Sequence, residues 1–305
     1  MNLLPEIRKE GIQLHSVCYP KSFLEKIALV REIKRFDIVY LQKKLMTSPE
    51  LRVLRRYAKR LFFDFDDAVY CKDDTHAELE SRSRELRFHN IVRNADLVVA
   101  GNTTLAGCVG PFNKNVVVVP SAVETRNIPV KDYSAVGTDI IIGWVGGKGN
   151  LHHLQMLSPI LQRLSREHRI QVNIVCDAAI DIPSVRVNHI PWRLETQERE
   201  IALFDIGVMP LPDNEWARGK CGYKALQYMA AAVPSVISDV GSNRDILEHD
   251  REGFLVSSTD GFYHSIQSLI RDKNLRERIG GNARKKVEKT FSIHAVGKKL
   301  AAVLQ

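Results

Sequence analysis

Residues 140–166 read IIIGWVGGKGNLHHLQMLSPILQRLSR. The near-continuous apolar run Ile140–Val145 is typical of a strand that is buried on both faces of a parallel sheet. Several glycines within residues 146–149 predict a tight turn. The apolar period of Leu151–Arg166 predicts a helix. A buried strand, a glycine turn and a helix together form the repeating unit of an α/β fold.

The same alternation of apolar runs and helical periods continues through the chain. In the first half we expect strands at Ile12–Cys18, Asp37–Leu41, Leu61–Phe65, Leu97–Ala100 and Val116–Val119. In the second half we expect further strands at Gln171–Val175, Arg186–Ile190, Ile206–Met209, Ser235–Ser238 and Gly253–Val256. Helices are expected at Ser48–Lys59, His76–Asn94, Gly261–Arg271, Asn274–Lys289 and Ile293–Leu304. The pattern predicts an α/β protein with two Rossmann-like, doubly wound parallel-sheet domains.

A loose segment predicts where one domain ends and the next begins. Residues 122–138 contain a proline, a glycine and several polar residues, which is the composition of an interdomain linker. We therefore expect an N-terminal domain over residues 1–125 and a C-terminal domain over residues 139–290. The helix in residues 291–305 is expected to cross back to the N-terminal domain. Met1–Gly11 resembles the end of a helix, and no glycine-rich opening turn follows, so the N-terminal domain is expected to lack its first βα unit.

Charge and composition restrict the partners. The chain of 305 residues has a formal net charge of +8 and a pI near 9.2, which suits a nucleotide, an acidic membrane surface or a nucleic acid. No recognition helix and no stacking set of aromatic residues is evident, so we do not expect nucleic acid binding. The cysteines are scattered without a CxxC pair, and reduced thiols without a zinc site are expected. His152 and His153 are adjacent and are expected on divergent sides of a helix, so no metal site is predicted.

The expected location follows from the same features. No apolar run has the length of a bilayer-spanning helix. We therefore expect a cytoplasmic protein that is soluble or peripheral to the inner face of the membrane.

Residues 216–245, WARGKCGYKALQYMAAAVPSVISDVGSNRD, are expected to bind a ligand. Lys220, Lys224 and Gln227 are spaced by four and three residues, so they are predicted to share one helical face. A helix start with free N–H groups and lysines suits a diphosphate. Solvent-exposed lysines and a structural glutamine are the alternative reading. The candidate ligand contacts here are Lys220, Gly222, Tyr223, Lys224 and Gln227.

The turn after the strand Ile140–Val145 is a second candidate phosphate contact. Gly146 and Gly147 allow a close backbone approach, and Lys148 adds charge at the start of the following helix. The spacing matches neither the P-loop nor the GxGxxG pattern. A tight turn with an exposed lysine is the alternative.

Acidic residues end the expected strand Leu61–Phe65. Asp66 and Asp67 would lie at the carboxyl end of a parallel strand, where open α/β sheets bind ligands. A helix N-cap or a turn-stabilising role is the alternative.

Two further features have both a functional and a structural reading. Trp192 and Trp216 are candidate walls for a base or a sugar, and burial in the core is the alternative. A helix with several basic residues is a candidate contact for anionic lipid headgroups, and an ordinary solvated helix face is the alternative. These basic residues are Arg52, Arg55, Arg56, Lys59 and Arg60.

These motifs together resemble those of the family 4 (group 1) sugar-nucleotide glycosyltransferases. In the second half the resemblance is carried by DIGVMPLP (205–212), WARGKCGYK (216–224), LQYMA (226–230), Pro234, SDVG (238–241), NRD (243–245), GFL (253–255) and FS (291–292). In the first half it is weaker and is carried by YLQK (40–43), FDFDD (63–67) and PSAVE (120–124). The resemblance implies the GT-B fold, in which the C-terminal domain holds most of the donor.

The resemblance also implies roles for single residues. Relatives have two glutamates that contact the donor sugar and the ribose, and these positions fall on Gly219 and Gln227. The phosphate clamp of relatives is reduced to Lys148, with Lys220 and Lys224 available to replace it. Asp66 and Asp67 fall near a histidine that relatives carry close to the acceptor, and the N-terminal glycine-rich loop has no counterpart.

The resulting hypothesis is a retaining glycosyltransferase that needs no metal and no cofactor besides its co-substrate, a nucleotide-diphosphate sugar. The acceptor would be a saccharide or a lipid-linked molecule. Lys224, with Lys148 and Lys220, would neutralise the leaving diphosphate, and Asp66 or Asp67 would position the acceptor hydroxyl. The alternatives are a non-catalytic nucleotide-binding or scaffolding protein and, less favoured, a sugar-nucleotide epimerase.

Overall fold

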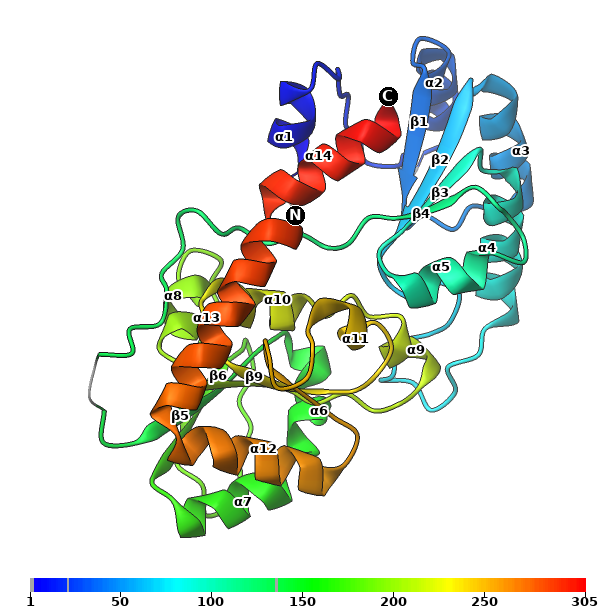
Figure 1. Ribbon diagram of the computed structural model, residues 1–305. Helices are drawn as coiled ribbons and strands as arrows, with labels where there is room; N and C mark the ends of the chain where they lie inside the picture. Colours follow the sequence, from blue (N-terminus) through cyan, green and yellow to red (C-terminus); the bar gives the residue numbers. More distant parts are fainter. Residues whose placement is uncertain (1–2, 21, 135–136) are drawn as a thin grey trace. The chain divides into compact units, whose positions relative to one another are not determined.

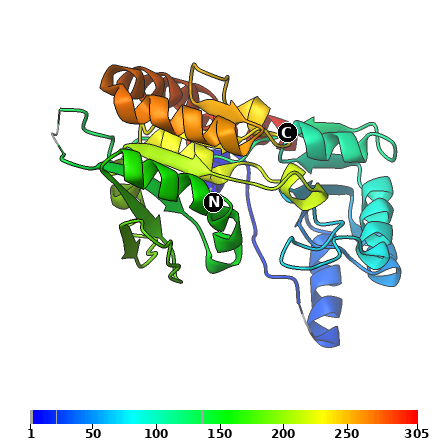
Figure 2. The ribbon, with the colours of Figure 1, turned by 90° about the horizontal axis from the view of Figure 1, so that it is seen from below.

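The computed structural model describes residues 3–20, 22–134 and 137–305 (Figure 1). The chain forms two compact units. Unit 1 comprises residues 122–213 and 222–295, and unit 2 comprises the chain up to Ser121 together with Asn214–Cys221 and Val296–Gln305. Two segments of the second half therefore belong to unit 2, and Asn214–Cys221 interrupts the range expected for the C-terminal domain. The blue-to-teal part of the ribbon in Figure 1 and Figure 2 belongs to unit 2.

Unit 2 contains a four-stranded sheet that is parallel throughout and follows the chain order. Its strands are β1 (Ile38–Gln42), β2 (Arg60–Phe65), β3 (Leu97–Ala100) and β4 (Val116–Val118). Its helices are α1 (Leu4–Lys9), α2 (Phe23–Ile33), α3 (Ser48–Tyr57), α4 (Arg82–Asn94), α5 (Thr103–Val109) and α9 (Glu215–Arg218). Alternate residues Leu61, Phe63 and Phe65 point into a core with side chains of α3 and α4.

Two expectations for the first half are wrong. Ile12–Cys18 forms no strand, and Val17 within it is 52% exposed. Polar residues alternate with its apolar ones, and the described residues offer it no strand partner. The expected helix His76–Asn94 begins only at Arg82, as α4, because a stretch without regular structure precedes it.

Unit 1 contains a six-stranded parallel sheet in the order β10-β9-β8-β5-β6-β7. The strands are β5 (Ile140–Val145), β6 (Ile170–Val175), β7 (Val187–Ile190), β8 (Ile206–Met209), β9 (Ser235–Ser238) and β10 (Phe254–Val256). The helical elements are η1 (Lys148–Asn150), α6 (Leu151–Gln155), α7 (Ser158–Glu167), α8 (Gln197–Ala202), α10 (Tyr223–Ala230), α11 (Asn243–Ile246), α12 (Thr259–Arg271) and α13 (Lys273–Thr290). The last helix, α14 (Ile293–Leu304), begins in unit 1 and continues into unit 2.

Helices pack against both faces of the unit 1 sheet. On one face, Trp144, Val172 and Val208 form a core with side chains of α7 and α12. On the other face, α10 contacts α8 and α13. Helices on both faces of a parallel sheet define a doubly wound domain. Among the described residues, no helix combines the length and apolar character that a membrane span requires.

The expected helix Leu151–Arg166 is broken into two. The first part, α6, ends at Gln155, and α7 restarts at Ser158 with a proline in its first turn. Proline cannot donate the backbone hydrogen bond of a helix interior, but it suits the first turn. Pro159 therefore fixes where the second helix begins.

Candidate functional site

The carboxyl end of the unit 1 sheet contains a switch point between β5 and β8. These strands are neighbours, yet β5 continues to β6 and β7 on one side while β8 continues to β9 and β10 on the other. Ligands of open α/β sheets bind in the crevice outside such a switch point. Two elements predicted from the sequence come after these strands: the turn at Gly146 directly after β5, and α10, which is separated from β8 by residues 210–222 with the short helix α9.

The turn and the helix meet at Lys224. A Cβ atom placed on Gly146 would lie 2.7 Å from Lys224 Cε, so the glycine leaves the space that the lysine stem occupies. Lys224 Nζ lies 5.5 Å from the centroid of the Trp144 ring. This cation–π geometry holds the ammonium group at the end of β5. The two phosphate-binding elements predicted from the sequence are therefore adjacent within unit 1.

A buried tyrosine fixes α10 against both strands of the switch point. Tyr228 Oη accepts a hydrogen bond from Val145 N at 3.3 Å and donates one to Val208 O at 3.1 Å. Gly207 provides the necessary space, since a Cβ there would lie 2.7 Å from the tyrosine ring. The C-terminal half of α10 is thus held in position by hydrogen bonds from Tyr228 to β5 and β8.

The backbone of the Gly146 turn has a partner that the sequence reading missed. Lys148 N donates to Asp177 Oδ1 at 3.0 Å, and this bond is the main reason why the pKa of Asp177 is lowered. Asp177 follows the end of β6, so its place after a buried strand was the available signal. The Lys148 side chain is exposed, as is Gly147. Both are open to a ligand from solvent.

The N-terminus of α10 has an unusual cap. Gly222 adopts the left-handed conformation, with φ of 57°, and no side chain caps the helix. The first N–H groups of a helix without a side-chain cap are available to an anion. Tyr223, the first helical residue, is 45% exposed. Lys220 lies outside the helix, before its cap, so the expectation that Lys220 and Lys224 share one helical face is wrong.

Gln227 and Trp192 are joined through a residue that was not predicted. Gln197 Oε1 accepts hydrogen bonds from Trp192 Nε1 and from Gln227 Nε2, both at 3.1 Å. Gln227 is only 8% exposed, whereas Trp192 is 44% exposed. One donor group of Gln227 is therefore already used inside the protein.

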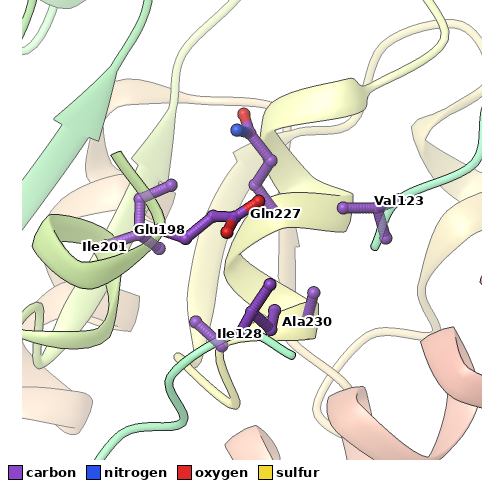
Figure 3. Close-up of a pocket in the computed structure, with 7 residues that line it drawn as sticks. Val123, Ile128, Glu198, Ile201, Gln227 and Ala230 are labelled. Atoms are coloured by element: carbon purple, nitrogen blue, oxygen red, sulfur yellow. The ribbon is translucent and has the colours of Figure 1, made fainter. Parts of the chain in front are cut away.

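A small pocket lies beside this network, between α8, α10 and residues 123–128. Its lining residues are Val123, Ile128, Glu198, Ile201, Gln227, Ala230 and Ala231. Figure 3 shows the Glu198 carboxylate beside the stem of Gln227, with the Gln227 amide pointing away from Ile128 and Ala230. Burial, followed by the nearby charge of Glu124, raises the pKa of Glu198. The pocket is mostly apolar and is small for a nucleotide.

In unit 2, the two predicted aspartates share one lysine. Lys43 Nζ pairs with Asp66 and lies 2.8 Å from Asp67 Oδ2. Lys43 follows β1 and has a positive φ of 54°, which is uncommon for a residue other than glycine. Asp64 is the residue before the last one of β2, and its carboxylate accepts a hydrogen bond from Gln42 Nε2 at 2.9 Å. Asp66 and Asp67 are therefore counterions of a lysine, and their N-cap alternative is not what the structure shows.

The structure distributes the predicted site residues between the units. Unit 1 holds Gly146, Gly147, Lys148, Trp192, Gly222, Tyr223, Lys224 and Gln227, whereas unit 2 holds Asp66, Asp67, Trp216 and Lys220. Lys220 Nζ lies 5.0 Å from the centroid of the Trp216 ring. The expectation for the adjacent histidines is wrong, since the rings of His152 and His153 are 4.1 Å apart rather than divergent.

Comparison with known proteins shows what the second half resembles. Residues 139–272 match the profile of the family described as glycosyl transferases group 1. This part of the chain is therefore similar to group 1 glycosyltransferases. The capsular polysaccharide biosynthesis glycosyltransferase CapM of Staphylococcus aureus is 22% identical over 253 residues, which cover 77% of this chain and 62% of CapM. An uncharacterized glycosyltransferase of Methanocaldococcus jannaschii is 32% identical over 84 residues, 27% of this chain and 22% of that protein. The chain thus spans less than two thirds of either relative.

Solved structures extend the likeness to both units. Sucrose-phosphate synthase of Thermosynechococcus elongatus has a TM-score of 0.73 at 15% identity and covers 92% of this chain and 76% of its own. Anabaena HepE in complex with UDP and glucose has a TM-score of 0.70 at 15% identity, with 92% and 80% covered. At such identities the likeness concerns the fold alone. The two parallel-sheet units have the GT-B fold, as the sequence motifs implied.

Proposed function

We propose that the protein transfers a sugar from a nucleoside diphosphate donor to a saccharide or a lipid-linked acceptor. The observation that carries this proposal is the position of Lys224, with its stem against Gly146 and its ammonium group over Trp144 at the switch point of unit 1. The family of residues 139–272 supports it. HepE, which has a similar fold, is a complex with UDP and glucose.

The charge that develops on the leaving diphosphate has several partners in this proposal. Lys224, Lys148 and the first-turn N–H groups of α10 donate to its oxygens, and Lys220 adds a further cation. Preorganised donors of this kind stabilise charge that grows in the transition state. Because lysines and a helix N-terminus supply this charge, the proposed reaction needs no metal ion. The family resemblance supports retention of anomeric configuration.

The acceptor is proposed to bind at the carboxyl end of the unit 2 sheet. Asp66 and Asp67 accept hydrogen bonds from acceptor hydroxyl groups, and Lys43 pairs with both carboxylates and orients them. A hydroxyl group held by a carboxylate is fixed in direction, which favours its attack on the sugar over attack by water.

A second function is favoured by one observation. Gln227 stands where relatives carry the ribose-binding glutamate, is almost fully buried, and donates to Gln197. A protein without that glutamate could bind nucleotides without catalysing transfer. Such a protein would show affinity for nucleoside diphosphates but would transfer no sugar. The two functions therefore differ in turnover and not in binding.

The test combines binding and turnover. Calorimetry with UDP, GDP and ADP measures affinity, and release of nucleoside diphosphate from a panel of nucleotide sugars measures turnover, with and without a chelator. We expect Lys224→Met to lower turnover about 10- to 100-fold, the cost of about one strong charged contact. Turnover should be unchanged by the chelator.

The matched control is Lys289→Met, which removes an exposed lysine at the end of α13 and should leave turnover unchanged. Binding without turnover on any donor and acceptor would support the non-catalytic function. Absence of binding to every nucleoside diphosphate would refute both functions.

We also propose peripheral attachment of the protein to anionic membranes through α3. Arg52, Val53 and Arg56 are exposed on this helix, with Val53 at 45%. The structure reduces the basic surface expected from the sequence, because Arg55 pairs with Asp96 and Lys59 pairs with Asp37, each at 2.9 Å. The remaining arginines and the apolar tip of Val53 suit a surface of anionic headgroups.

A further inference from the structure

Asn102 lies two residues after the end of β3 in unit 2 and caps the next helix, α5. Its Oδ1 atom accepts a hydrogen bond from Leu105 N at 2.8 Å, which is the standard N-cap of α5. The residue is 5% exposed. This role uses only the oxygen of the side chain, and serine, threonine or aspartate would perform it as well.

The amide nitrogen of Asn102 makes a second set of contacts, far along the chain. Asn102 Nδ2 lies 3.1 Å from Gly219 O, 3.3 Å from Lys220 O and 3.3 Å from Cys221 Sγ. An amide group has two hydrogens, so these three acceptors share them. Each residue of Gly219–Cys221 therefore has an atom within hydrogen-bond distance of the Asn102 amide nitrogen.

The loop Gly219–Cys221 is seated on the carboxyl ends of β2 and β3. A Cβ on Gly219 would lie 2.7 Å from Ala68 Cβ, and a Cβ on Gly101 would lie 2.6 Å from Cys221 Sγ. Cys221 Sγ also donates to Asp66 O at 3.1 Å. These contacts leave the loop little room to move, and all of them lie within unit 2.

The loop carries one charged side chain and leads directly into α10. The ammonium group of Lys220 lies over the ring of Trp216, 5.0 Å from its centroid. Cys221 is followed by Gly222, the left-handed cap of α10. The backbone that Asn102 holds therefore includes the residue from which the Lys220 side chain extends, two residues before the cap of α10.

We propose that Asn102 is a positioning residue, whose side-chain amide fixes the Gly219–Cys221 loop so that Lys220 can reach the diphosphate of the donor. The inference rests on the proposed function, because it gives Lys220 a partner in the donor. The proposal implies that the affinity for the diphosphate depends on the side-chain N–H groups of Asn102 as well as on the Asn102 oxygen that caps α5.

Two substitutions distinguish the role of the Asn102 amide N–H from the role of the Asn102 oxygen that caps α5. Asn102→Ser keeps an N-cap oxygen and loses the amide donor. Asn102→Asp also keeps the cap, but places a carboxylate oxygen opposite the carbonyl groups of Gly219 and Lys220, which it repels. Both variants preserve α5, so both should fold, and Asn94→Ser on the exposed side of α4 serves as the matched control.

The first readout is affinity for UDP, GDP and ADP by calorimetry. We expect Asn102→Ser to weaken the nucleoside diphosphate that binds best about 5- to 20-fold, as for a hydrogen bond that orients a charged group, and Asn102→Asp to weaken it more. In a Lys220→Met background the effect of Asn102→Ser should shrink to less than about twofold, because the two residues act through one contact. Equal affinity of wild type and Asn102→Ser, or the full effect in the Lys220→Met background, would overturn the proposal.

The second readout is amide hydrogen exchange of residues 218–222, which does not depend on a ligand. Exchange there should be faster in Asn102→Ser than in Asn94→Ser, with residues 103–109 of α5 unchanged. Unchanged exchange in the loop would show that Asn102 does not hold it. If the wild type binds no nucleoside diphosphate while the loop is released in Asn102→Ser, the proposed function fails, and with it the role of Asn102 toward the donor.

Discussion

Three carboxylates at the carboxyl end of β2 have different partners and so different properties. Asp66 and Asp67 are paired with Lys43, whereas Asp64 is bonded to the neutral side chains of Gln42 and Tyr40. Burial raises the pKa of Asp64 from its ordinary 3.8 to about 6, and these hydrogen bonds and the charge of Lys43 offset only part of that effect. Asp64 is thus a carboxyl group whose ionisation at neutral pH costs stability.

Asp64→Asn should stabilise the protein at neutral pH. Because the folded pKa of Asp64 lies above the unfolded one, the folded state binds more protons between about pH 4 and pH 6, and stability falls as pH rises through that window. Asparagine can still accept from Gln42 without this cost. We expect a gain of about 1–2 kcal/mol near pH 7.5 that vanishes near pH 4, measured by urea unfolding.

The control for this prediction is Asp37→Asn, since Asp37 is exposed and its pKa is lowered by Lys59. It should give no gain at neutral pH. A gain for Asp64→Asn that did not change between about pH 4 and pH 7.5 would rule out ionisation as its cause.

At the scale of single elements, α10 depends on the conformation of its cap. Gly222 has φ of 57°, and a Cβ there would collide with Ile246 and lie 3.0 Å from Asn243 Oδ1. Glycine satisfies both the positive φ and the close approach. The helix that carries Lys224 thus begins where it does because residue 222 has no side chain.

Gly222→Ala should destabilise the protein by about 2–4 kcal/mol, since it adds left-handed strain and a steric clash in a packed region. Gly281→Ala is the matched control, because Gly281 lies inside α13 with nothing within 4 Å of a Cβ. Alanine at that helix position should raise stability by about 0.5–1 kcal/mol. Thermal unfolding of both variants checks the pair, and similar effects of the two changes would contradict the role given to Gly222.

Buried strands were the elements that sequence reasoning located best. The strand at Ile140–Val145 has the expected bounds, and so do Leu97–Ala100, Ile206–Met209 and Ser235–Ser238, because strands buried on both faces are mostly apolar and stand out from the polar segments around them. Ile12–Cys18 failed since a short apolar segment does not reveal whether a partner strand exists. The break of the expected helix at Pro159 was signalled by the proline itself.

The candidate site was predictable only where chemistry follows a strand. Lys224 and Gly146 were selected from the glycine turns and the lysine pattern, and the structure brings the two together, although Lys220 does not share the helix of Lys224. Lys43, Asp177 and Asn102 were not, because each acts through a contact with residues distant in the sequence. Such contacts depend on which strands are neighbours, and residue spacing alone does not specify that order.

At the scale of the whole molecule, the net charge of +8 favours anionic surfaces. We expect the protein to bind vesicles that contain phosphatidylglycerol and not vesicles of phosphatidylcholine alone, with binding lost at about 0.5 M salt. Arg52→Ala combined with Arg56→Ala should weaken binding about 10- to 30-fold, at about 1 kcal/mol for each arginine. Co-sedimentation with vesicles measures this.

The control for the vesicle experiment removes two exposed arginines of unit 1, by Arg166→Ala and Arg199→Ala. It lowers the net charge by the same amount. If both double variants lost binding equally, overall charge rather than α3 would be responsible.

The path of the chain through its two units has a practical consequence. Because residues 214–221 belong to unit 2 while the residues on both sides belong to unit 1, no single cut divides the protein into its halves. A chimera that exchanges unit 1 between relatives should therefore graft residues 122–213 and 222–295 and leave residues 214–221 with the parent that supplies unit 2. Recombination at one crossover point would separate residues 214–221 from the part of unit 2 against which they pack.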